Sequence, residues 1–260
     1  MKTFAMMNMK GGVGKTVTTI QLATILTNQY GKTVLVVDCD GQCNLSRFYA
    51  ADYIDDMTVA NVMERSCESY RKDNVQLVRP NLYLLPASRD LYRLDLAAMQ
   101  NGNAHINALR NFVEVVAEDQ EVDVVLFDCP PGFTAASTAA LIAADELIIP
   151  ILMDGFSIEG MAEMALQVES MRQVNPRLKV AGVLINQWHR CQAVEQGEKL
   201  LREMKLLPVF RQVIRRTDKV PESTFVKQPV MDYSYRSAAS QDYRLLAQEI
   251  FGEVPDNGSL

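Results

Sequence analysis

The sequence has few cysteines, and their spacing is not that of a paired set. Five cysteines in 260 residues are an odd number, and no C-x-x-C pair occurs among them. Such a pattern argues against a disulfide framework and against a zinc site of four cysteines. We therefore expect reduced thiols at all five positions, which are Cys39, Cys43, Cys67, Cys129 and Cys191.

Long hydrophobic runs are missing as well. The longest apolar stretches, Val122 to Phe127 and Glu146 to Met153, fall far short of the roughly 20 residues that cross a bilayer. The N-terminal residues Met1 to Phe4 lead directly into a strand-like run and leave no room for a signal peptide. These features predict a cytoplasmic protein.

Internal repeats, low-complexity tracts and Gly/Ser linkers are also absent. Hydrophobic residues make up 48% of the chain and charged residues 22%, which is typical of a globular protein with a sizeable core. The simplest interpretation is one domain over residues 1–252, followed by a flexible tail at residues 253–260.

The charge is unevenly distributed along the chain. The formal net charge is −6, which argues against a surface that is basic throughout. Between Gln196 and Lys227, however, eight basic and four acidic residues give a local net charge of +4, so the remainder carries −10. This segment is a candidate DNA-binding surface, although most charged runs are solvated helix faces. Its basic residues are Lys199, Arg202, Lys205, Arg211, Arg215, Arg216, Lys219 and Lys227.

Short apolar runs alternate with segments of helical periodicity. Such alternation predicts an α/β fold, with a mostly parallel twisted β-sheet, helices on both faces and functional loops at the carboxyl ends of the strands. The expected strands are Thr3 to Met7, Thr33 to Val37, Leu82 to Leu85, Val122 to Phe127, Leu147 to Leu152 and Val180 to Ile185. The expected helices are Lys15 to Gln29, Ile106 to Glu118, Ala135 to Ala144, Glu159 to Val174, Ala193 to Met204 and Ser237 to Phe251.

A glycine loop connects the first expected strand to the first expected helix. The loop reads Lys10-Gly11-Gly12-Val13-Gly14-Lys15-Thr16, followed by Val17. Glycines let backbone N–H groups point at phosphate oxygens, and the helix N-terminus adds its positive dipole end. In such a P-loop, Lys15 binds the β- and γ-phosphates of ATP and Thr16 places its hydroxyl on Mg²⁺.

This loop departs from the usual P-loop at its start. The pattern G-x-x-x-x-G-K-[ST] would put a glycine at position 9, where the chain has Met9 followed by Lys10. Lys10 comes too early to reach its own γ-phosphate as Lys15 does. We therefore expect Lys10 to reach a nucleotide held by a facing subunit, which predicts a homodimer that forms on ATP binding.

Three aspartates follow two of the expected strands. Asp38 and Asp40 lie one residue apart, so in an extended chain their side chains share a face. One can hold Mg²⁺-bound water while the other orients the attacking water. Asp128 ends the hydrophobic run before Pro130 and Pro131, in the place where an aspartate meets Mg²⁺ through water.

These segments together resemble the ParA/MinD ATPases. The glycine loop is similar to the deviant Walker A box of that family, whose early lysine crosses the dimer interface, and Asp128 lies in a Walker B-like segment. The resemblance implies that Asp40 positions the hydrolytic water and that Asp38 supports the metal site. Gly41 stands where the similar family box, D-x-D-P-Q-x-N, has a proline.

The resemblance also reaches the base-binding region. Asn186 ends a late strand, and its amide can both donate to and accept from an adenine edge. By resemblance, Asn186 is the adenine contact. The family's Pro-Arg-Asn stretch corresponds here to Arg215-Arg216-Thr217, so only Arg216 is carried over as a nucleotide contact.

Several functions share such a nucleotide site. MinD-type proteins end in a basic amphipathic helix, whereas this chain ends in Glu253-Val254-Pro255-Asp256, so we expect no membrane attachment. An iron–sulfur carrier needs bridging cysteines, and Cys129 alone is not enough. Tyrosine kinases of capsule export carry a terminal tyrosine cluster, and here Tyr233, Tyr235 and Tyr243 are too scattered.

The favoured function is DNA partitioning. In it, the ATP-bound dimer binds DNA of any sequence, associates with the nucleoid, and is released when a ParB-like activator stimulates a slow ATPase. The alternative is a MinD-like or cargo-positioning regulatory protein that holds ATP and does not bind DNA.

Overall fold

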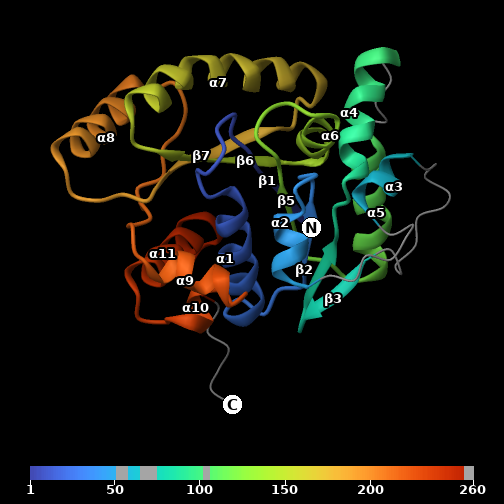
Figure 1. The fold of residues 1–260 in the computed structure, drawn as a ribbon, viewed down its shortest axis with the longest axis horizontal. Coiled ribbons are helices and arrows are strands. Elements are labelled where there is room, and N and C mark those ends of the chain that lie inside the picture. Colours follow the sequence, from blue (N-terminus) through green and yellow to red (C-terminus); the bar gives the residue numbers. More distant parts are fainter. Residues whose placement is uncertain (51–57, 65–74, 102–105, 255–260) are drawn as a thin grey trace.

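The protein folds around one seven-stranded β-sheet (Figure 1). The computed structural model describes residues 1–50, 58–64, 75–101 and 106–254. The strand order is β3-β4-β2-β5-β1-β6-β7, and every neighbouring pair is parallel except β3 and β4. The strands are β1 (Lys2–Met6), β2 (Val34–Asp38), β3 (Gln76–Arg79), β4 (Leu82–Leu85), β5 (Val124–Asp128), β6 (Glu146–Leu152) and β7 (Lys179–Asn186).

Residues of the central strands alternate between two hydrophobic cores, one on each face of the sheet. In β1, Phe4 and Met6 enter one core, whereas Ala5 and the following Met7 enter the other. Side chains of successive strand residues point to opposite faces, so a continuous apolar run is what a strand covered on both faces requires. The central strands are accordingly buried along their whole length except at Lys2.

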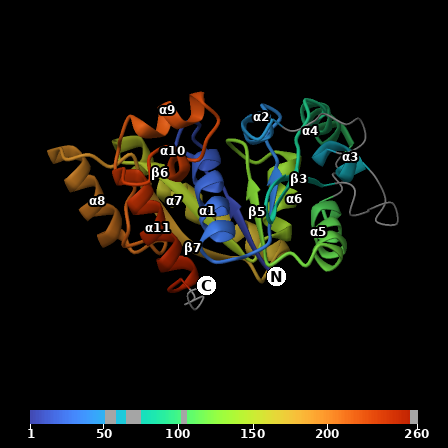
Figure 2. The ribbon, with the colours of Figure 1, turned by 90° about the horizontal axis from the view of Figure 1, so that it is seen from below.

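Helices cover both faces of the sheet. One face carries α1 (Lys15–Asn28), α2 (Asn44–Phe48), α9 (Lys219–Phe225), α10 (Val230–Tyr233) and α11 (Ala238–Phe251). The other carries α3 (Val59–Glu64), α4 (Asp90–Asn101), α5 (Ala108–Asp119), α6 (Ala135–Ala143), α7 (Gly155–Val174) and α8 (Gln192–Met204). Seen from below, α1 and α11 lie side by side, and α5 lies beyond the sheet (Figure 2).

The predicted fold class is confirmed. All six predicted strands and all six predicted helices are present, and most of their first and last residues lie within two positions of the predicted ones. The largest difference is α7, which begins at Gly155 because Asp154 caps it by accepting a hydrogen bond from the Ser157 N–H at 2.7 Å. The edge strand β3 and the helices α2, α3, α9 and α10 were not predicted, since each is only four to seven residues long. The 12-residue helix α4 was also missed. Cys67 and most of the expected tail lie outside the described residues, and the other four cysteines are free thiols.

Candidate functional site

Four parallel strands deliver the predicted site residues to one edge of the sheet. The glycine loop follows β1, the Asp38–Asp40 turn follows β2, Asp128 ends β5 and Asn186 ends β7. In the sheet, Asp128 is paired with Met6 on one side and with Asp38 on the other. The carboxyl edge of a parallel sheet is where ligands bind in doubly wound folds, so the arrangement is that of a binding site.

The glycine loop curls at two positions that favour glycine. Gly12 and Gly14 have positive φ angles of 75° and 93°, which a residue with a Cβ adopts only with strain. At Gly14 a Cβ would also collide with the side-chain amide of Asn186. Gly14 is the N-cap of α1 and has no side chain that could accept hydrogen bonds from the first N–H groups of the helix. These N–H groups are therefore available to an anion.

Lys15 is enclosed by this loop. Lys15 is only 7% exposed, and its ammonium donates to the carbonyl oxygens of Lys10 at 3.0 Å and Asn8 at 3.4 Å. Burial lowers the pKa of Lys15, while Asp128, Cys129 and Asp40 oppose that shift. Among the described residues, the hydrogen bonds of this buried cation go to backbone carbonyls, so a polyphosphate would stabilise it strongly.

Lys10 lies at the rim of the loop rather than inside it. Its ammonium is 2.9 Å from both carboxylate oxygens of Asp154 and 3.3 Å from the Ser157 hydroxyl. It also lies 5.6 Å from the centre of the Phe156 ring, which is 76% exposed. Burial would raise the pKa of Asp154, but the hydrogen bonds from Lys10 and Ser157 outweigh it and lower that pKa.

The turn after β2 is organised by its own carboxylates. The two oxygens of Asp38 accept from the Asp40 N–H at 3.1 Å, from the Ser46 N–H at 2.9 Å and from the Ser46 hydroxyl at 2.6 Å. Asp40 accepts from the Gln42 N–H through one oxygen at 2.8 Å. Burial raises the pKa of Asp38 to about 6, against the effect of the Ser46 hydrogen bonds.

Asp128 is a buried carboxyl group whose oxygens lack hydrogen-bond partners among the described residues. Both of its oxygens are buried without a hydrogen-bond partner within that part of the chain, although the Thr16 hydroxyl is near enough to act on its pKa. Burial and the neighbouring Asp38 raise the pKa of Asp128 well above its usual value. Native proteins rarely leave a carboxylate in this condition, so the pair of Asp128 and Thr16 fits a hard cation with oxygen ligands.

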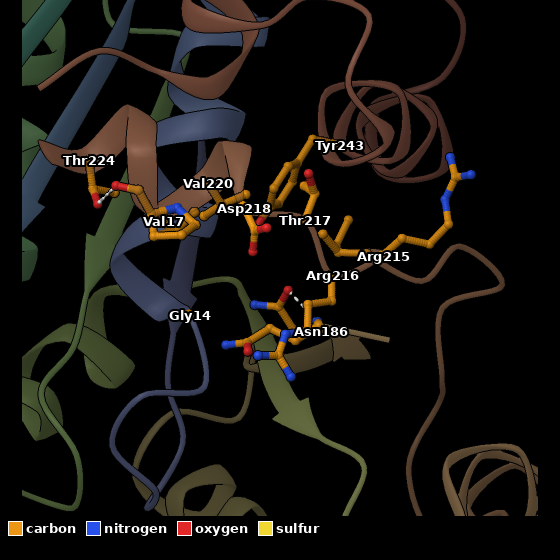
Figure 3. A pocket seen from close by; sticks show the side chains of 13 residues that line it. Gly14, Val17, Asn186, Arg215, Arg216, Thr217, Asp218, Val220, Thr224 and Tyr243 are labelled. Carbon is orange, nitrogen blue, oxygen red and sulfur yellow. Dashed lines mark hydrogen bonds between the residues drawn. The ribbon is translucent and has the colours of Figure 1, made fainter. Parts of the chain in front are cut away.

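A cavity of about 350 Å³ adjoins the glycine loop (Figure 3). Its wall includes Gly14, Val17, Arg216 and Asp218. Asn186 also lines the cavity, is 5% exposed, and donates its amide nitrogen to the Val13 carbonyl at 2.8 Å. The cavity has the size and the mixed polar and apolar wall that a nucleoside needs.

Most of the candidate basic residues are engaged in ion pairs. Arg215 points away from the cavity and binds Asp242 at 2.8 Å, and Arg202 binds Glu198 at 2.9 Å (Figure 3). Lys219 is 2.7 Å from Glu222, while the pairs of Lys199 with Glu203 and Arg211 with Glu249 are looser, at 3.9 and 3.7 Å. Three candidates form no ion pair with a described residue, namely Lys205, Arg216 and Lys227.

The structure thus brings together the glycine loop, Asp38, Asp40, Asp128, Asn186 and Arg216 at one edge. The sequence analysis missed Asp154, Ser46 and Tyr243, whose hydroxyl is 3.4 Å from Thr18. Asp154 precedes a helix with a serine three positions on, which is a capping signal but says nothing about Lys10. No helix in the described part of the chain is long and apolar enough to cross a membrane.

Known proteins are similar to this chain in sequence and in fold over nearly its whole length. A family model described as an AAA domain matches residues 1–180. The chain is 30% identical over 258 residues to the chromosome partitioning protein ParA of Caulobacter vibrioides, covering 98% of this chain and 96% of that protein. It is also 30% identical over 259 residues to the chromosome-partitioning ATPase Soj of Thermus thermophilus, covering 98% and 97%.

Solved structures agree with this similarity. The apo structure of McdA from Cyanothece superposes with a TM-score of 0.82 at 20% identity, covering 96% of this chain and 99% of that one, and shows the shared fold. Cobyrinic acid a,c-diamide synthase from Mycobacterium smegmatis, with a bound ATP analogue and magnesium, superposes with a TM-score of 0.77 at 25% identity, covering 97% of each chain.

Proposed function

Because the chain belongs to the ParA/Soj family of P-loop ATPases, we propose that it is a partitioning ATPase that works as a nucleotide-dependent dimer switch. It binds ATP with Mg²⁺, dimerises, and in that state binds DNA without regard to sequence. Slow hydrolysis, stimulated by a basic ParB-like activator, returns it to the monomer and releases the DNA.

The observation that carries this proposal is the different placement of the two loop lysines. Lys15 is buried in the loop, whereas the Lys10 ammonium is turned outward to Asp154, and both side chains of that pair are partly exposed. A cation at the rim is available to a second molecule facing the loop. In the dimer, Lys10 exchanges Asp154 for the polyphosphate of the partner's nucleotide, which is a stronger anion.

Within one subunit, the loop amides and Lys15 hold the phosphates of ATP, and the cavity beside Asn186 and Arg216 holds the nucleoside. Thr16 and Asp128 hold Mg²⁺, which offsets the charge on the phosphates. The cation also removes the electrostatic cost of the buried, unpartnered Asp128. Asp38, whose oxygens are occupied by Ser46 and Asp40, supports this site by fixing the turn.

Hydrolysis is assigned to the same turn. Asp40 uses one carboxylate oxygen to hold the Gln42 N–H, and the other is left to orient the attacking water. Asp40 as a whole residue is 9% exposed, so it is largely shielded from solvent. Its role is to place a water in line with the γ-phosphate, since phosphoryl transfer depends mainly on positioning and charge stabilisation.

DNA binding is assigned to the basic residues that form no ion pair with a described residue, which are Lys205, Arg216 and Lys227 and are all exposed. Contacts to the DNA backbone need only lysine and arginine, and a dimer presents two such surfaces. Because ATP drives dimerisation and the dimer presents twice the basic surface, DNA binding becomes dependent on ATP.

The test combines sedimentation with DNA binding. With ATP and Mg²⁺ the protein should sediment as a dimer and bind DNA of unrelated sequences, and with ADP it should do neither. Lys227→Ala should weaken DNA binding while leaving the ATP dimer intact, with Lys199→Ala, whose lysine already faces Glu203 at 3.9 Å, as the matched control. Equal DNA affinity in both nucleotide states contradicts the proposal.

A second candidate function is supported by the ion pairs themselves. Five of the eight candidate basic residues face a carboxylate, which reduces the charge available to DNA. In this alternative the ATP dimer positions a protein cargo and does not bind DNA. An ATP-dependent dimer without measurable DNA binding at low salt, where phosphate contacts are strongest, identifies this function.

A further inference from the structure

Gly41 lies under an aromatic ring. The residue is buried, and a Cβ added to it would come within 2.8 Å of Cζ and 3.0 Å of both Cε atoms of Tyr92. Tyr92 belongs to the first turn of α4 and is 49% exposed. The tip of the tyrosine ring therefore occupies the space that a side chain at position 41 would fill.

The turn beneath this ring carries the hydrolytic residue. The Cys43 N–H donates to the Asp40 carbonyl at 2.8 Å, which closes a four-residue turn with Gly41 in its second position. Glycine is the least restrained residue there, whereas proline is favoured at that position because its φ is fixed. Within the turn, the Gln42 N–H bond to Asp40 and the weak Cys43 thiol bond to the Gly41 carbonyl provide the remaining restraint.

A second contact joins the same two parts of the chain. The Ala87 N–H, in the loop that leads into α4, donates to the Ser46 hydroxyl at 3.0 Å, and that hydroxyl donates to Asp38 at 2.6 Å. The start of α4 is thus connected to the turn on both sides, through Ser46 to Asp38 and through Tyr92 to Gly41.

On the basis of the hydrolytic role proposed above for Asp40, we propose that Tyr92 is a positioning residue for ATP hydrolysis. Its ring packs on Gly41 and restrains the turn from outside, as a proline at position 41 would from within. The contact described for the Tyr92 ring is with the turn at Gly41, so its effect falls on turnover and not on nucleotide binding.

The test uses four variants and two measurements. Tyr92→Ala removes the ring, Tyr92→Phe keeps it, and Leu96→Ala changes an exposed apolar residue, 62% exposed, one turn farther along α4. Gly41→Pro/Tyr92→Ala replaces the outer restraint by an inner one. The measurements are steady-state ATP hydrolysis and the alkylation rate of Cys43, which is 2% exposed, with the buried Cys129 as internal reference.

Tyr92→Ala should lower kcat about tenfold with KM for ATP unchanged, because misplacing a catalytic group by about 1 Å can cost up to about a hundredfold in rate. It should also raise the alkylation rate of Cys43 severalfold relative to Cys129. Tyr92→Phe and Leu96→Ala should behave as the wild type. The double variant should recover both kcat and slow alkylation, which a purely structural role for Tyr92 does not predict.

If Tyr92→Ala has the same kcat and the same Cys43 alkylation rate as the wild type, the inference is wrong. Failure of the proposed function looks different: Asp40→Ala then hydrolyses ATP as fast as the wild type. In that case the alkylation of Cys43, which does not depend on turnover, decides alone whether Tyr92 restrains the turn.

Discussion

Replacing Asp154 by asparagine should tighten the ATP dimer. In the structure Asp154 binds Lys10 at 2.9 Å and also caps α7 by accepting from the Ser157 N–H at 2.7 Å. Asparagine keeps the cap, because its side-chain oxygen accepts the same hydrogen bond, and removes the charge that holds Lys10. Asp154→Ala removes both, and the lost cap alone costs about 1 kcal/mol of stability.

The size of the effect follows from the exposure of the pair. The Lys10 and Asp154 side chains are 39% and 42% exposed, so solvent screens their attraction and the pair contributes about 0.3–1 kcal/mol. Each dimer breaks two such pairs, one per subunit. Asp154→Asn should therefore stabilise the dimer by about 0.6–2 kcal/mol, which lowers its dissociation constant by a factor of about 3–30.

The assay is sedimentation velocity with ATP and Mg²⁺, in an Asp40→Ala background that slows hydrolysis. The difference between Asp154→Asn and its parent should shrink as salt is raised, because exposed ion pairs are screened. A dissociation constant that is unchanged or higher in Asp154→Asn refutes the idea that Lys10 leaves Asp154 on dimerisation.

Three further predictions concern the nucleotide site. Asp40→Ala should bind ATP and keep the dimer on DNA, measured as a slower release than for the wild type, and normal turnover in this variant removes Asp40 from the mechanism. Gly14→Ala should abolish nucleotide binding in calorimetry and destabilise the protein by about 1–3 kcal/mol, because the new Cβ meets Asn186 at a φ of 93°; wild-type affinity contradicts the role of the glycine. Asp128→Asn should remove the strengthening of ATP binding by Mg²⁺, measured by calorimetry with and without the cation, because an amide is a weaker ligand for a hard cation than a carboxylate; an unchanged Mg²⁺ effect contradicts the metal role of Asp128.

The parts of the site that the sequence predicts are those fixed by strand ends. A buried run followed by a polar residue determines both the strand and the edge at which Asp38, Asp128 and Asn186 emerge. The glycine loop is predictable for a similar reason, because its positive φ angles at Gly12 and Gly14 require that residue type.

The contacts that the sequence does not predict join distant segments through exposed side chains. Lys10 and Asp154 are 144 positions apart, and no local pattern couples them. Tyr92 is half-exposed on α4 and lies 51 positions after Gly41, so no local pattern predicts that its ring packs on that glycine. The ion pairs of the basic segment are equally tertiary, as with Arg215 and Asp242, which joins a loop to α11.

Complementation between two inactive variants tests most directly whether Lys10 serves the partner's nucleotide. In a mixed dimer of Lys10→Ala and Asp40→Ala, the first subunit keeps its own Lys15 and Asp40 and receives Lys10 from the second, so one of the two sites is complete. Random mixing makes about half of the dimers mixed, and the rate should recover to about a quarter of that of the wild type. A mixture that stays as inactive as the separate variants shows that Lys10 acts within its own subunit, and contradicts the account.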